Sequence, residues 1–220
     1  MKKLIIGILV WQLMLACFSC KHEPEKIIGI KIYQYNQDFN QLVEKWKDIG
    51  INTAFVSKEL AGNKDFRQIL KANDINVYII FPVFYDQELL KDDSTLYAIT
   101  DKGKIAKDDW VEFVCPSRIA YRKKKIDEAA ELVRTLQPEG LSIDFIRQFV
   151  FWEMIYPDRA AESIDMACFC DSCVGSFSRK NNITLPDTCT TTAQKSEFIL
   201  NNHSDSWNNF RCDLIASMTK

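Results

Sequence analysis

Three cysteines lie within the six residues CFCDSC (168–173) of a 220-residue chain that has eight cysteines in all. Thiolates this close in sequence suit two kinds of chemistry, because they can bind a metal ion such as zinc or form disulfides. A third interpretation is that they have no partner in the chain. The spacing alone leaves these alternatives open, so the choice depends on what the rest of the chain brings near them.

Asp144 is the best candidate for a catalytic carboxylate. It lies in GLSIDFIRQ (140–148), a segment with the composition of a strand, and the period of two places it on the same face as Ser142. A carboxyl group near the end of such a strand can donate a proton or act as a nucleophile. The alternative is a structural aspartate paired with Arg147 or Lys31, and the sequence favours neither.

Four apolar segments alternate with helical patterns in the first two thirds of the chain. Strand composition occurs at 27–34, 51–57, 75–85 and 140–148. Apolar residues at helical spacing predict helices from Asp38 to Gly50, near 65–72, and over 118–136 ahead of Pro138. This alternation is typical of right-handed βαβ units and a parallel sheet.

The two faces of the expected strands differ in character. In the first strand, one face carries Ile28, Ile30 and Ile32 and the other carries Gly29, Lys31 and Tyr33. In the fourth strand, one face carries Leu141, Ile143 and Phe145 and the other carries Ser142 and Asp144. One apolar and one mixed face suit a barrel interior better than a sheet covered on both sides. No glycine-rich phosphate loop follows the first strand, which weakens a nucleotide-binding alternative. We therefore expect an α/β fold, the N-terminal part (about four βα units) of a (β/α)8 TIM barrel.

Three segments together resemble a known class of enzymes. FVCPSRIAYRKKKI (113–126), GLSIDFIR (140–147) and CFCDSCVGSFSRKNNITLP (168–186) are similar to segments of TIM-barrel glycoside hydrolases. More narrowly, the chain resembles glycoside-hydrolase-like bacterial lipoproteins, with a cysteine arrangement also found in family-42 β-galactosidases. The resemblance covers roughly residues 27–215, and the combined cysteine pattern is its most specific part.

The resemblance implies a structural zinc site. In those β-galactosidases one cysteine after the third strand joins a C-x-C-x2-C cluster after the fourth. The matching positions here are Cys115, Cys168, Cys170 and Cys173. Four thiolates form a closed tetrahedral site with no position open for water, so such a Zn²⁺ would be structural. The alternative is disulfide bonding in an oxidising compartment, with Cys189 and Cys212 as further partners.

The resemblance also implies carbohydrate chemistry. Glycosidases need two carboxyl groups flanking the scissile bond. Asp144 resembles the nucleophile of several barrel hydrolase clans, and we expect Glu153 as the second acid, although the Asn-Glu pair of the family-42 enzymes is absent from this strand. Substrate-binding residues are expected at strand ends and in the following loops, namely Tyr33, Tyr35, Tyr85, Trp110, Arg147 and Trp152. His203 is expected in an exposed loop, and no serine or cysteine nucleophile has an evident histidine base.

The N-terminus predicts export. Lys2 and Lys3 precede an apolar run that ends at Leu15, too short for a comfortable membrane span. The following Ser19-Cys20 resembles a bacterial lipobox, so residues 1–19 are expected to be a lipoprotein signal peptide and 20–26 a lipid-anchored tether, with Cys17 as the alternative lipid site. We expect a membrane-anchored protein of the cell envelope, in the outer membrane.

Charge and length bound the remaining possibilities. The formal charge of −2 becomes −4 when the two lysines of residues 1–19 are removed, and no basic stripe suggests nucleic acid. Residues 27–220 are expected to form one truncated barrel domain, since a complete barrel has eight units and typically about 250 residues. Two function classes compete: a glycosidase in its full-length form, and a non-catalytic carbohydrate-binding or functionless lipoprotein fragment. Exposed barrel edges would allow self-association.

Overall fold

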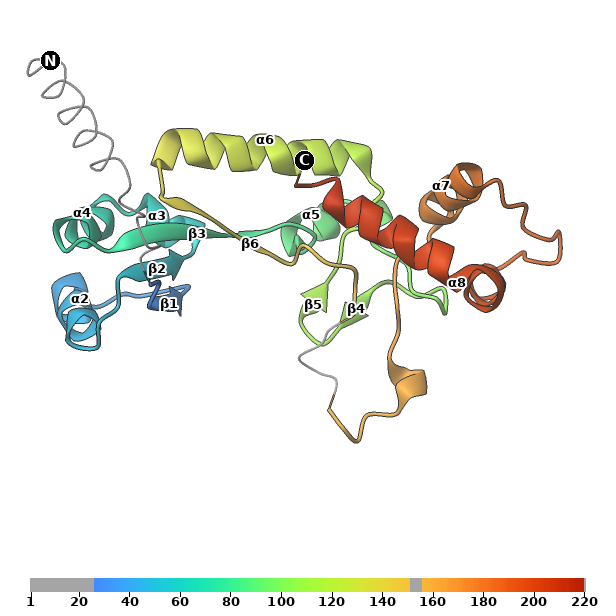
Figure 1. Cartoon of the computed structure of the whole chain (residues 1–220), viewed down its shortest axis with the longest axis horizontal. Helices are drawn as coiled ribbons and strands as arrows, with labels where there is room; N and C mark the ends of the chain where they lie inside the picture. The colour runs from blue at the N-terminus through green and yellow to red at the C-terminus, as the bar shows by residue number, and fades with distance from the viewer. Residues whose placement is uncertain (1–25, 151–155, 220) are drawn as a thin grey trace, which may run out of the picture.

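Four parallel strands form the central sheet. The structure is a computed structural model that describes residues 26–150 and 156–219. The strands β1 (Gly29–Ile32), β2 (Thr53–Val56), β3 (Asn76–Pro82) and β6 (Gly140–Asp144) pair in the order β1-β2-β3-β6, each parallel to the next (Figure 1). The predicted α/β fold with four strands is thus confirmed, and β1 and β6 are its two edge strands.

Helices connect the strands and cover the apolar face of the sheet. They are α2 (Phe39–Asp48), α3 (Lys58–Gly62), α4 (Lys64–Ala72) and α6 (Ile119–Leu136). The first three helices are capped at their N-termini by Asp38, Ser57 and Asn63, respectively. Each of these side chains accepts a hydrogen bond from a backbone N–H group in the first turn. A buried core of Val56, Phe66 and Ile79 with their neighbours fills the space between β2, β3 and these helices. Burial of this apolar face therefore fixes which face of the sheet remains open.

The connection from β3 to α6 contains structure that the sequence patterns did not predict. It includes α5 (Gln87–Asp92), a 3-10 turn (Ser94–Leu96) and an antiparallel hairpin of β4 (Lys107–Asp108) and β5 (Val111–Glu112). The β-strands of this hairpin have two residues each, too short to show an alternating pattern. The hairpin lies beyond the carboxyl ends of the central strands (Figure 1).

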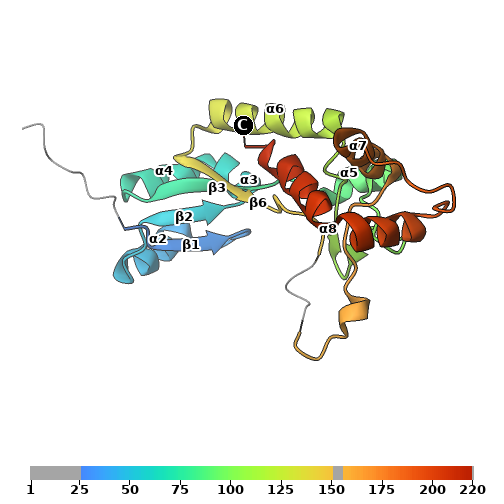
Figure 2. The ribbon, with the colours of Figure 1, turned by 45° about the vertical axis from the view of Figure 1, so that its right-hand side comes forward.

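The chain after β6 forms a short 3-10 turn (Ala161–Ser163) and two helices, α7 (Asp171–Asn181) and α8 (Thr192–Ala216). Both helices lie at the end of the molecule opposite α2 and β1 (Figure 2). The prediction for His203 was wrong, because this residue lies inside α8, where its φ of −142° marks a kink. Trp207, on the second part of α8, is fully buried.

The strand faces follow the predicted alternation except at the end of β6. Leu141 packs against the helix-covered core, but Ile143 on the edge strand is 44% exposed. Phe145 was predicted on the same outer face, and this was wrong. The strand ends at Asp144, and Phe145 has a φ of +49°, a left-handed conformation that bulky residues rarely adopt. This turn directs the Phe145 ring away from the helices and toward the hairpin. There the ring packs on Tyr85.

The open face of the sheet is lined by two aromatic rings that lie over glycines. A methyl group at Gly140 would lie 2.6 Å from Cε1 of Tyr78, and one at Gly29 would lie 2.5 Å from Cε2 of Phe55. The two rings contact each other with centroids 5.4 Å apart. The glycines therefore give the rings room to lie flat at the amino-terminal end of this face.

Among the described residues, no helix has both the length and the apolar character needed to span a bilayer. The predicted signal peptide, tether and lipid site at Cys20 lie outside the described residues. Self-association through the edge strands stays a prediction.

Phe66 should be a stability determinant of the helix-covered core. Its side chain is fully buried, with its ring 4.8 Å from that of Phe39 and 6.4 Å from that of Trp46. Phe66→Ala is expected to lower the free energy of unfolding by about 3–5 kcal/mol in urea titrations, because it leaves a cavity. Ile119→Ala, at a position 78% exposed, should change it by less than about 0.5 kcal/mol. Equal losses in the two variants would contradict the described packing.

Candidate functional site

A cavity of about 600 Å³ opens at the carboxyl ends of the central strands. We call it the mouth cavity; its lining includes Tyr33, Pro82, Tyr85, Trp110, Asp144 and Phe145. The volume is within the usual range for sites that bind small molecules. Four of the predicted site residues, Tyr33, Tyr85, Trp110 and Asp144, therefore line one cavity.

Four aromatic rings form one wall of the mouth cavity and its support. Tyr85 and Phe145 stack with centroids 4.8 Å apart, and Trp110 meets both rings edge-on at 5.7 and 6.2 Å. Phe113 supports Phe145 from 5.8 Å. Such pairs hold aromatic side chains in fixed orientations. Trp110 is nevertheless 49% exposed, so part of its ring is available to a ligand.

The hairpin that carries Trp110 is held by a buried carboxylate. Glu112 accepts a hydrogen bond from the Tyr97 hydroxyl at 2.5 Å and pairs with Lys107. Hydrogen bonding by Lys107 and Tyr97 lowers the pKa of Glu112, while burial and the Glu112 carboxylate raise the pKa of Tyr97 to about 12. From α5, the Gln87 side chain donates to the Trp110 carbonyl at 2.8 Å. Trp110 is thus positioned from both sides.

Asp144 has both carboxylate oxygens engaged. Oδ2 lies 3.0 Å from the Lys31 ammonium, and Oδ1 accepts the Phe145 backbone N–H at 2.9 Å. Burial lowers the pKa of Lys31, but hydrogen bonds with Tyr33 and Asp144 together raise it by more. The pKa of Lys31 is therefore above the ordinary value of a lysine. Arg147 and Lys31 were the two predicted structural partners of Asp144, and Lys31 forms the ion pair with it. The sequence placed Lys31 and Asp144 on the same polar face, and this contact agrees with that placement.

The other predicted residues have different positions. The Arg147 guanidinium lies over the Phe145 ring at 5.5 Å and the Phe113 ring at 6.0 Å, so it supports the aromatic wall. The Tyr35 ring packs on Phe39 at 5.8 Å. Trp152 and Glu153 lie outside the described residues.

Several residues of the cavity were missed by sequence reasoning. Phe145 was assigned to the wrong face because its left-handed turn interrupts the alternation. Acidic side chains that also line the cavity are Glu59, Asp86, Glu88 and Glu128. Two of these, Asp86 and Glu128, pair with the buried Lys125 at 3.5 and 3.2 Å. They come from α5 and α6, and no periodic signal relates them to Asp144.

A second site is the cysteine cluster, which we define as Cys115, Cys168, Cys170 and Cys173. All four side chains are buried, none is in a disulfide, and their sulfurs all lie within 4.8 Å of one another. Cys115 Sγ lies 3.5 Å from Cys170 Sγ and 3.5 Å from Cys173 Sγ. A disulfide requires about 2.05 Å, whereas a tetrahedron with metal–sulfur bonds of about 2.3 Å has edges of about 3.8 Å. The donor set and spacing therefore fit a metal ion, and the sequence-based grouping of these four residues is confirmed.

Local hydrogen bonds favour the thiolate form at Cys170. Cys170 is the N-cap of α7 and Cys173 lies in its first turn, where the helix dipole favours negative charge. Hydrogen bonds with Cys115, Cys168 and Cys173 lower the pKa of Cys170, whereas burial raises that of Cys168. Outside the cluster, the Ile99 N–H donates to Cys168 Sγ at 3.3 Å.

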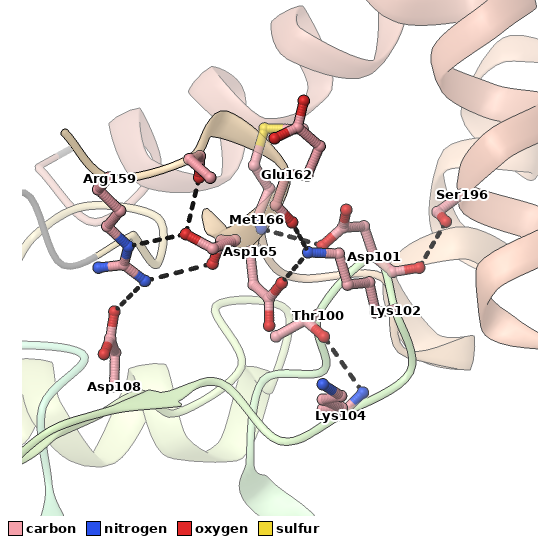
Figure 3. A network of polar contacts seen from close by, with 12 residues as sticks. Thr100, Asp101, Lys102, Lys104, Asp108, Arg159, Glu162, Asp165, Met166 and Ser196 are labelled. Atoms are coloured by element: carbon pink, nitrogen blue, oxygen red, sulfur yellow. Dashed lines mark hydrogen bonds and ion pairs between the residues drawn. The ribbon is translucent and has the colours of Figure 1, made fainter. Parts of the chain in front are cut away.

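Backbone pairing brings the two cysteine-bearing segments together. The Phe169 N–H donates to the Ile99 carbonyl at 2.7 Å, and the Asp101 N–H to the Met166 carbonyl at 2.8 Å. Figure 3 shows the polar network around this pairing, in which Lys102 contacts Asp165 at 2.5 Å. In the same network Arg159 pairs with Asp108 at 2.8 Å, and the Ser196 hydroxyl of α8 donates to the Asp101 carbonyl at 2.7 Å (Figure 3). These contacts join the loop after β3 to the loop after β6 and to α8.

Solved structures with a similar fold include two beta-galactosidases and a fucosidase. A beta-galactosidase from Bacillus circulans sp. alkalophilus has a TM-score of 0.59 at 13% identity, over 90% of this chain and 34% of that chain. A beta-galactosidase from the haloarchaeon Halorubrum lacusprofundi has a TM-score of 0.53 at 13% identity, over 83% and 28%. Alpha-L-fucosidase isoenzyme 2 from Paenibacillus thiaminolyticus has a TM-score of 0.51 at 11% identity, over 86% and 30%.

These identities establish the fold alone. The sheet and its helices form part of a TIM-barrel-like fold, and the chain spans about a third of the length of the similar structures. No known family of sequences matches the chain, and no curated protein matches it closely.

The cysteine cluster should bind one metal ion per chain. Protein purified without a histidine tag is expected to contain about one equivalent by elemental analysis, and Cys170→Ser should lose it, because three thiolates leave the tetrahedron open. Cys212→Ser is the matched control, since Cys212 is an exposed free cysteine outside the cluster. Metal-free protein without titratable thiols would instead establish disulfides.

Proposed function

We propose that this chain is a glycoside-hydrolase-like protein that binds carbohydrate in the mouth cavity. The observation that carries the proposal is the meeting of Tyr33, Tyr85, Trp110 and Asp144 around one cavity at the carboxyl ends of parallel strands. Barrel enzymes hold their chemistry at this end. The names of the similar structures, beta-galactosidases and an alpha-L-fucosidase, agree with a sugar ligand.

Ligand binding in the mouth cavity combines aromatic faces with charge. Tyr33 and Trp110 are 52% and 49% exposed, and the exposed part of each ring would stack on the apolar face of a sugar ring. Asp144 and Lys31 provide an acceptor and a donor for hydroxyl groups. Exclusion of water between ring and sugar would strengthen these polar contacts.

In a hydrolytic protein, Asp144 would be one of two required carboxyl groups. Its ion pair with Lys31 would hold the carboxylate in place as a nucleophile or a base. The proton donor would be a second acid at the cavity. Glu153 remains our sequence-based candidate for it, and Glu59 and Glu88 are exposed acids in the cavity lining.

A non-catalytic carbohydrate-binding protein is the second candidate function. It is favoured by one observation, that Lys31 and the Phe145 N–H occupy both oxygens of Asp144. A carboxylate held in this way can act purely as a hydrogen-bonding and structural group. The two functions differ in whether a bound glycoside is cleaved.

Trp110→Ala and Asp144→Asn separate these alternatives. Loss of the Trp110 ring should weaken sugar binding about tenfold, because stacking and apolar burial of one ring contribute about 1–1.5 kcal/mol. Binding is measured by calorimetry on a panel of mono- and oligosaccharides, and hydrolysis on aryl glycosides. Gln68→Ala is the control, since Gln68 lines a separate hollow that includes Asn76, at the amino end of β3.

The outcomes for Asp144 are distinct. In an enzyme, Asp144→Asn should reduce turnover by several orders of magnitude while sugar binding persists. Binding without any turnover in the unmutated protein would favour the non-catalytic function. Unchanged affinity in Trp110→Ala would remove the mouth cavity as the binding site.

The metal in the cysteine cluster is proposed to be zinc. Four buried thiolates in tetrahedral spacing suit Zn²⁺, and a site with four protein ligands is structural. When bound, the ion would link the loop after β3, through Cys115, to α7, through Cys170 and Cys173. Its role would be to hold these loops in place behind the mouth cavity.

We further propose export and lipid anchoring at Cys20, in agreement with Lys2, Lys3, the apolar run to Leu15 and Ser19-Cys20. Metabolic labelling with a palmitate analogue should modify the unmutated protein in a bacterial host, and Cys20→Ala should abolish the label. Label that persists in Cys20→Ala and disappears in Cys17→Ala would move the anchor to Cys17. Absence of label in the unmutated protein would contradict lipid anchoring.

A further inference from the structure

The second half of α8 packs on residues that lie next to the cysteine cluster in sequence. Trp207 is fully buried and stacks on Phe169, which lies between Cys168 and Cys170 in sequence, with ring centroids 4.7 Å apart. The same indole meets the Phe177 ring of α7 edge-on at 4.9 Å. Arg211 follows Trp207 by four residues, so it lies one turn further along the same face of α8.

Arg211 is a cation whose partners are incomplete. Its Nη2 donates to the Ala167 carbonyl, immediately before Cys168, at 3.0 Å. Its Nε is buried and has no hydrogen-bond partner among the described residues. Within the same described part of the chain, no carboxylate forms an ion pair with this guanidinium. A partly buried charge without a counter-ion is costly, so a nearby anion would stabilise it.

The Arg211 guanidinium lies beside the cysteine cluster, because the carbonyl that it contacts belongs to the residue before Cys168. Burial lowers the pKa of Arg211, and the nearby sulfurs of Cys212, Cys168 and Cys173 oppose that shift. Four thiolates around a divalent ion carry a net charge of about −2, which a buried site must balance. A neutral donor gives part of this balance, from the Ile99 N–H to Cys168 Sγ at 3.3 Å.

We propose that Arg211 is the partly buried counter-cation of the metal–thiolate site and thereby links metal binding to the docking of α8. The inference rests on the proposed metal site. The guanidinium stabilises the deprotonated sulfurs that bind the ion, and the charged site in turn provides the anion that Arg211 otherwise lacks. Metal binding and the packing of Arg211 and Trp207 therefore favour one another.

Metal affinity and its pH dependence test this role. Arg211→Met removes the charge and should weaken metal binding about 10–100-fold in chelator competition, the usual effect of losing a group in contact with metal ligands. Because protons compete with the metal for less stabilised thiolates, half-release of the ion should also move to higher pH. Arg211→Lys keeps the charge and should retain a release pH near that of the unmutated protein.

Arg122→Met is the matched control. Arg122 is also partly buried and also holds α8, but its partners there are Ser217 and Met218 at the end of that helix. It should leave metal affinity and release pH unchanged. Cobalt substitution gives a direct readout, since the intensity of thiolate-to-cobalt absorption reports occupancy independently of any enzymatic activity.

Three results would contradict the inference in distinguishable ways. Native protein that binds neither zinc nor cobalt would remove the metal site and the role of Arg211 together. Native affinity in Arg211→Met would remove the role of Arg211 alone. If Arg211→Met does not fold, the lysine variant decides, because a release pH raised in Arg211→Lys would show that the charge is not what the site requires.

Discussion

The parallel register between β3 and β6 is the constraint on which both candidate sites depend. Pro82 pairs with Asp144, so the chain leaves both strands at the same edge of the sheet. The Val83 N–H then donates to the Asp144 carbonyl at 2.9 Å, and the two following loops begin side by side. The mouth cavity takes residues from the beginnings of these loops, and the cysteine cluster takes its ligands from their distant ends. A change of register would separate the members of both sites.

The cysteine cluster lies within an already formed core. Backbone hydrogen bonds between Ile99 and Phe169 and between Asp101 and Met166 join its two loops, and Trp207 covers them. Small zinc domains differ, because they lack such a core and unfold without metal. In this chain the ion would therefore order the loops locally, and the central sheet, with its separate core around Phe66, does not depend on it.

Sequence patterns predicted the regular part of the fold and much less of the loops. The four central strands and the helices α2, α4 and α6 were predictable because burial of one face imposes a period of two or 3.6 residues. The cysteine grouping was predictable from a resemblance that relates Cys115 to residues more than fifty positions away. The direction of the Phe145 side chain was not predictable, because a single left-handed residue reverses it without altering the apolar pattern. The two-residue strands of the hairpin and the acids that line the mouth cavity likewise leave no periodic trace.

The rings over Gly29 and Gly140 restrict how this sequence can change. A side chain at position 140 would occupy the place of the Tyr78 ring, and one at position 29 that of the Phe55 ring. The two rings also touch, so the four positions form a single steric unit across all four strands. A larger residue at either glycine is compatible with the fold only if the ring above it becomes smaller. Among related chains, these positions should consequently vary in concert, with the summed side-chain volume kept nearly constant.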